Sequence, residues 1–118
     1  NGSDEIHKEN IEKITPRILV LMNLFSLQDL NNNEELDDMI NDVINEASKF
    51  GNVGNAIFPR PNKNSNENEP KGLGREYLEF EQASSCLDAA IGLAGRLYNQ
   101  RLVVTSFYDL DRFYKKDL

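Results

Sequence analysis

The chain has 118 residues, of which 28% are charged and 39% are hydrophobic, and its formal net charge is −7. This length suffices for one domain with a hydrophobic core, and the acidic charge argues against sequence-independent nucleic-acid binding, because phosphate is repelled. A single cysteine, Cys86, excludes an internal disulfide and favours an intracellular compartment. No apolar run approaches the roughly 20 residues of a membrane span, so no membrane partner is expected. The first residue is not Met, which suggests a longer parent chain.

The N-terminal segment, residues 1–16, is polar and ends at a proline, so we predict a disordered tail before a domain over residues 17–118. The domain opens with a short, branched apolar run from Arg17 to Leu24, which predicts a buried central strand. The only histidine, His7, lies in the tail and is given no role.

An amphipathic helix is predicted from Glu34 to Phe50, because apolar residues recur there at intervals of three and one. An asparagine among Asn31–Asn33 is expected to cap its start, and Gly51 is expected to end it. The helix is followed by a second predicted strand, Val53–Phe58, and by a low-complexity loop over residues 62–71 that is predicted to be mobile.

The remaining elements follow from alternation, small-residue spacing and terminal glycines. They are a strand with Leu78 and Phe80 on its core side, a helix capped by Ser84 or an earlier residue, a fourth strand and a short terminal helix: Gly74–Glu81, Ser84–Ala94, Arg101–Phe107 and Leu110–Lys116. The whole order predicts an α+β fold, a four-stranded antiparallel sheet with two helices on one face and an extra C-terminal helix.

Two stretches carry a functional signal. Asp38, Asp42 and Glu46 recur every fourth residue and form one acidic stripe on the first helix, without an interleaved cation. Such a stripe is ordinarily a solvated face. It borders the apolar face here, and a second stretch offers Arg96 and Tyr98 two residues apart, so that a guanidinium and an aromatic ring can face one ligand. We therefore interpret the two stretches as one site.

The βαββαβ order resembles an RNA recognition motif, with Leu19–Leu24 matching its hexamer and Leu73–Phe80 its octamer. Members that bind RNA stack bases on aromatic residues at three sheet positions. Those positions hold Val20, Arg75 and Tyr77, of which only one is aromatic. The sheet is therefore poorly equipped to stack bases, and the terminal helix near Phe113 and Tyr114 is expected to cover it.

The stretch Arg96-Leu97-Tyr98 resembles the Arg-X-Phe signature of U2 auxiliary factor homology motifs, or UHM domains, a branch of that superfamily. The similarity runs from Arg17 to the end and is closest to the C-terminal domain of U2 auxiliary factor large subunits. Matching stretches include Leu21-Met22-Asn23, Pro59-Arg60-Pro61 and Val103-Val104-Thr105. The resemblance implies a non-catalytic protein–protein interaction module of a nuclear pre-mRNA splicing factor, which binds a short basic tryptophan-containing peptide during 3′ splice site recognition.

The resemblance also implies a set of peptide-binding residues: Asp38, Asp42, Glu46, Arg96, Leu97 and Tyr98. Arg96 and Tyr98 would flank a tryptophan pocket, with Glu46 paired to the arginine. Asp42 and Asp38 would meet the basic residues of the ligand. Tyr98 replaces the usual phenylalanine, and its hydroxyl needs water or a protein partner.

The implied partner is the tryptophan motif of a splicing factor such as the branch-point-binding protein or the U2 particle scaffold subunit, with RNA bound by other domains of the parent chain. The alternative is a domain that binds single-stranded RNA through its sheet. Catalysis is not expected: acylphosphatases share the element order, but Met22–Ser26 lacks the glycines and arginine of a phosphate-cradling loop, and no nucleophile–base pair is evident. No cofactor and no metal are expected.

Overall fold

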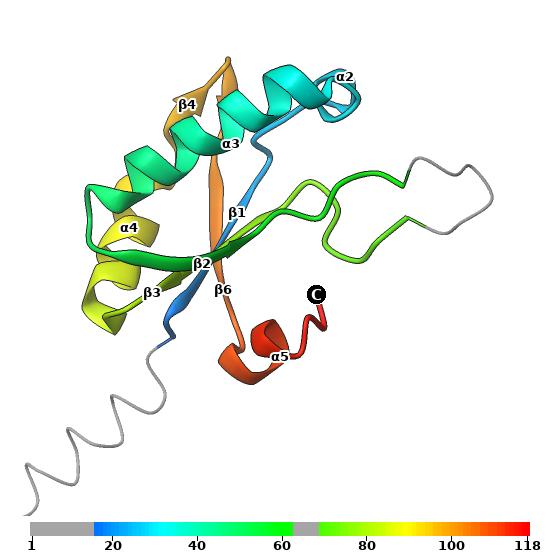
Figure 1. The fold of residues 1–118 in the computed structure, drawn as a ribbon. Helices are drawn as coiled ribbons and strands as arrows, with labels where there is room; N and C mark the ends of the chain where they lie inside the picture. Colours follow the sequence, from blue (N-terminus) through cyan, green and yellow to red (C-terminus); the bar gives the residue numbers. More distant parts are fainter. Residues whose placement is uncertain (1–15, 63–68) are drawn as a thin grey trace, which may run out of the picture.

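The computed structural model describes residues 16–62 and 69–118 (Figure 1). Most of the predicted tail (1–16) and of the predicted mobile loop (62–71) lies outside these ranges. The elements follow in the order β1 (Ile18–Met22), α2 (Leu27–Leu30), α3 (Asn33–Ser48), β2 (Val53–Ile57), β3 (Glu76–Phe80), α4 (Ala83–Leu93), β4 (Leu97–Tyr98), β5 (Arg101–Leu102), β6 (Val104–Tyr108) and α5 (Leu110–Tyr114).

The main sheet has four strands in the order β2-β3-β1-β6, and each neighbouring pair is antiparallel. Leu19 in the central strand β1 lies opposite Leu78 of β3 on one side and Phe107 of β6 on the other. The helices α3 and α4 lie on one face of the sheet, and α5 lies on the opposite face (Figure 1). The predicted α+β fold of the RNA recognition motif type is therefore confirmed.

Side-chain alternation divides the core between the two faces of the sheet. Leu78 and Phe80 are fully buried in the cluster beneath α3 and α4, as their alternation predicted. Val20 and Tyr77 face the other way and join Phe113 of α5 in a second cluster. Because every residue of β3 is buried, this strand is covered on both faces.

The helices α3 and α4 differ in how their ends are capped. The side chain of Asn32 caps α3 by accepting a hydrogen bond from the Glu35 amide at 3.3 Å, which confirms the predicted asparagine cap. The helix ends at Ser48, with Lys49 as its C-cap, slightly before the predicted end. The N-cap of α4 is Gln82, which precedes Ser84 and makes no side-chain capping bond.

The predicted fourth strand, Arg101–Phe107, is wrong as one continuous element. Arg101 and Leu102 form β5, which pairs with β4 in a separate hairpin, and only β6 joins the main sheet. The hairpin turn consists of Asn99 (φ 49°) and Gln100 (φ 68°), two successive left-handed residues that match the twist of a tight hairpin. The predicted connector Gly95–Asn99 is therefore partly a strand.

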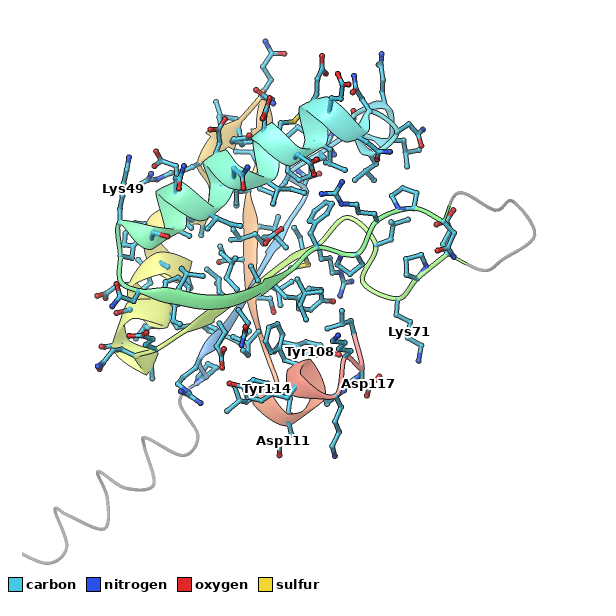
Figure 2. The ribbon with its side chains drawn as sticks, in the orientation of Figure 1. Lys49, Lys71, Tyr108, Asp111, Tyr114 and Asp117 are labelled. Carbon is cyan, nitrogen blue, oxygen red and sulfur yellow. The ribbon has the colours of Figure 1, made fainter. Side chains whose placement is uncertain are left out.

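The terminal helix covers the second face of the sheet, as predicted. Phe113 is only 2% exposed. Tyr114 lies on α5 (Figure 2), and its hydroxyl donates a hydrogen bond to the Glu79 carboxylate. The rings of Tyr77 and Tyr108 meet edge to face at 5.3 Å between centroids. The base-stacking position at Tyr77 is thus buried inside the protein.

Candidate functional site

A cavity of about 430 Å³ opens between α3, the end of α4 and the β4–β5 hairpin. Its apolar lining comes from β1, the segment after β1, α3, α4 and the residue between β5 and β6. The residues, in that order, are Leu21, Leu24, Val43, Leu93 and Val103. Its polar and rim residues come from α3 and from the start of the hairpin: Asp42, Asn45, Glu46, Arg96, Leu97 and Tyr98. An apolar cavity with a few convergent polar groups is the common form of a ligand site.

Arg96 is held at the rim of the cavity by two contacts. One guanidinium nitrogen, Nη1, lies 3.6 Å from Oε2 of Glu46, so the ion pair predicted between these residues is present. The guanidinium carbon also lies 5.9 Å from the centroid of the Phe50 ring, within cation–π range. The arginine side chain remains 52% exposed, so a ligand can reach it.

Glu46 is shared between two cations. Lys49, which projects from the end of α3 (Figure 2), lies 2.7 Å from Oε1 of Glu46, closer than Arg96 lies to Oε2. The hydrogen bond and charge of Lys49 lower the pKa of Glu46, and the more distant Arg96 adds a smaller effect in the same direction. Glu46 is therefore ionised at neutral pH and available to both cations.

Tyr98 also lines the cavity and is tied to α3. Its hydroxyl donates a hydrogen bond to the Met39 carbonyl at 3.2 Å, and its ring meets the edge of Phe25 at 5.9 Å. Burial raises the pKa of the Tyr98 hydroxyl, and the negative charges of Asp42 and Asp29 raise it further. The hydroxyl thus has the protein partner that replacement of phenylalanine by tyrosine requires.

All of the sequence-predicted site residues except Asp38 line this cavity. Asp38 lies one helical turn before Asp42 on α3, where it is exposed. Leu97 is 71% exposed and pairs across the hairpin with Leu102, also exposed. The apolar lining residues of the cavity were not predicted from the sequence, because they resemble ordinary core residues there. Asn45 was not predicted either, because it resembles an ordinary residue of a helix surface.

Metal binding and thiol chemistry have no structural basis within the described ranges. No group of three His, Cys, Asp or Glu residues there could hold a metal ion. Cys86 is fully buried, and burial raises its pKa to about 12, so the thiol stays protonated and unreactive. None of the described helices combines the length and apolarity needed to cross a membrane.

Comparison with known proteins identifies the family. No protein family model matches the chain. A splicing factor U2af large subunit of Nicotiana plumbaginifolia is 34% identical over 105 residues, which are 88% of this chain and 18% of that protein. The solved structure of the RNA15 RRM superposes with a TM-score of 0.52 at 17% identity, covering 85% of this chain and 98% of that one. The chain is related to the U2af large subunits and has the fold of an RNA recognition motif.

The chain spans about a fifth of the length of the U2af large subunits that it matches. Human serine/threonine-protein kinase Kist is 29% identical over 107 residues, which are 91% of this chain and 24% of the kinase. The present sequence contains no glycine-rich G-x-G-x-x-G loop, no H-R-D and no D-F-G motif. The similarity to Kist therefore does not extend to these kinase motifs. Similarity to U2af large subunits and the observed fold indicate a domain of a splicing-factor RRM type.

Proposed function

We propose that this chain is a UHM domain, a non-catalytic module that binds a short basic peptide and receives its tryptophan side chain in the cavity between α3 and the β4–β5 hairpin. The observation that carries the proposal is the construction of the cavity. Five apolar residues line the cavity, and Arg96, which pairs with Glu46, lines it together with Tyr98. A tryptophan needs this combination, because its indole is large and apolar and its face attracts a cation.

The free energy of peptide binding is expected to come from two sources, which are the cavity and the acidic stripe of α3. A guanidinium over an indole contributes about 0.5–2 kcal/mol, with the larger value where water is excluded. Asp42 at the rim and Asp38 one turn away are both exposed, so each is expected to contribute roughly 0.2–1 kcal/mol to a basic ligand and to lose this contribution at high salt. These two contributions are of similar size at low salt, and burial of the apolar indole in the cavity adds to the share of the tryptophan, which is therefore expected to supply the larger part of the affinity.

The names of the relatives support a class of partner. The relatives are named as splicing factors, which supports a role in nuclear pre-mRNA splicing for the parent protein. The ligand would be the tryptophan motif of another splicing factor, such as the branch-point-binding protein or the U2 particle scaffold subunit. RNA would be bound by other domains of the parent chain.

Direct RNA binding through the sheet is disfavoured by the covering helix. Of the three base-stacking positions, Val20 and Tyr77 are buried in the cluster that contains Phe113. The third, Arg75, is exposed but is not aromatic. Stacking is worth roughly 1–3 kcal/mol per base, so a sheet without accessible rings loses most of that affinity.

Calorimetric titration tests the proposal with three ligands: a basic peptide with one tryptophan, the same peptide with alanine at that position, and a polypyrimidine RNA. The expected result is saturable binding of the first peptide, at least tenfold weaker binding of the second, and at most weak RNA binding. Equal affinity for the two peptides would contradict the proposal. Micromolar or tighter RNA binding would favour the alternative instead.

A further inference from the structure

The hairpin that carries Arg96 and Tyr98 is fastened to the end of β1 by one residue, Asn23. The side-chain amide nitrogen of Asn23, Nδ2, donates a hydrogen bond to the backbone carbonyl of Leu102 at 2.8 Å. In return, Arg101 donates from Nε to the Asn23 carbonyl at 3.1 Å and from Nη2 to the Asn23 side-chain oxygen at 2.6 Å. These three hydrogen bonds join residues that lie 78 or 79 positions apart in the sequence.

This anchor depends on the conformation of Asn23. Its φ is 62°, in the left-handed region that asparagine tolerates better than most residues. With this backbone, both oxygens of Asn23 accept hydrogen bonds from the Arg101 guanidinium. A lysine could not reproduce the contact, because its ammonium is a point charge without the planar fork of donors.

The anchor matters because the hairpin has little structure of its own. It contains the pairs Leu97–Leu102 and Tyr98–Arg101, and two backbone hydrogen bonds extend it, from Gly95 to Val103 at 2.9 Å and from Val103 to Arg96 at 2.8 Å. A two-stranded hairpin of this length is still marginal in water. Arg101 is the direct cross-strand neighbour of Tyr98, so fixing Arg101 also fixes the strand that presents the tyrosine. On its other side the hairpin is attached to α3, where Tyr98 bonds to the Met39 carbonyl.

We propose that Asn23 and Arg101 are positioning residues of the peptide site, which hold the hairpin ready so that Arg96 and Tyr98 need no ordering when the ligand tryptophan enters. This inference rests on the proposed function. Neither residue lines the cavity, so their effect on a ligand acts through the hairpin. Ordering a binding segment before the ligand arrives raises affinity by reducing the entropy lost on binding.

The test uses Asn23→Gly, which keeps a left-handed backbone without strain but removes the side-chain contacts, and Arg101→Lys, which keeps the charge but loses the fork. Arg75→Lys is the matched control, because Arg75 is an exposed arginine away from the cavity. Each protein is titrated with the tryptophan peptide and its alanine counterpart, at a temperature where urea unfolding shows all variants to be folded. Amide exchange at Val103, whose N–H bonds to the Arg96 carbonyl at 2.8 Å, reports opening of the segment in the free proteins.

Asn23→Gly and Arg101→Lys are each expected to weaken binding of the tryptophan peptide about tenfold, because hydrogen bonds from a charged donor shift an equilibrium by about one to two orders of magnitude. Binding of the alanine peptide should change much less, Val103 should exchange faster, and Arg75→Lys should behave as the parent protein. If the parent binds the tryptophan peptide and both variants bind it as tightly as Arg75→Lys, the positioning role is overturned while the proposed function stands. If the parent fails to bind it, both proposals fall.

Discussion

Replacing Glu76 by glutamine should stabilise the protein, by an amount that grows with pH. Glu76 lies in β3 on the same face as Leu78 and Phe80 and is only 1% exposed, and neither of its carboxylate oxygens has a hydrogen-bond partner among residues 16–62 and 69–118. Burial raises the pKa of this carboxyl to about 8, against a smaller opposing effect of Arg60. The attraction of Arg60 compensates only a small part of the hydration that a charge loses in this place.

The raised pKa of Glu76 determines how the stability of the protein changes with pH. The folded state holds the proton more tightly than the unfolded chain, whose pKa is 4.5. The contribution of Glu76 to stability is therefore fully present below the unfolded pKa and is lost as pH rises through about 8. Relative to a neutral side chain, the loss is about 1 kcal/mol near pH 5, about 3 kcal/mol near pH 7 and about 5 kcal/mol above pH 9.

Urea unfolding of the parent and of Glu76→Gln, measured from about pH 5 to about pH 9, tests this reasoning. The gain in unfolding free energy should increase across the series, toward a limit of a few kcal/mol. The control is Glu81→Gln, which changes an exposed carboxyl just beyond the same strand and should show no comparable trend. A gain that is equal at the two ends of the pH range, or no gain at the alkaline end, would refute the argument.

Three further predictions concern the two faces of the sheet. Asp42→Lys should weaken peptide binding more at low salt than at high salt, because the contact is exposed and screened; calorimetry showing equal losses would contradict this. Lys49→Gln should raise peptide affinity about two- to fivefold, because Glu46 would then form an ion pair with Arg96 alone. An unchanged or lower affinity would contradict the competition of Lys49 and Arg96 for Glu46. Phe113→Ala should cost about 3–5 kcal/mol of unfolding free energy and spare peptide affinity, so loss of binding by a folded variant would contradict the separation of the faces.

Long periodic segments of this fold could be predicted from the sequence. The apolar spacing of α3 and the alternation of β3 persist over enough residues to indicate both the element and its buried face. The hairpin could not be predicted in this way. Its turn, Asn99-Gln100, contains no glycine, and Leu102, Val103 and Val104 read as one apolar strand although the sheet pairing changes between them.

The candidate site was predictable only in part. Spacing brought Asp42 and Glu46 to one stripe, while resemblance to the family paired Glu46 with Arg96. The apolar lining of the cavity required the three-dimensional structure, because Leu21 and Leu93 look like ordinary core residues in the sequence. The anchor of Asn23 to Arg101 was also invisible, since nothing in the local sequence relates positions 78 residues apart.

The tryptophan of the ligand offers the most direct view of the proposed site, because this chain contains none of its own. Its emission therefore reports the ligand alone when tryptophan is excited selectively. The measurement is the emission wavelength and iodide quenching of a basic single-tryptophan peptide, titrated with the parent protein and with Tyr98→Ala. We predict a blue shift and protection from iodide with the parent, and the loss of most of both effects with a folded Tyr98→Ala variant. A bound peptide whose tryptophan stays open to iodide, or an equal blue shift with Tyr98→Ala, would contradict the account.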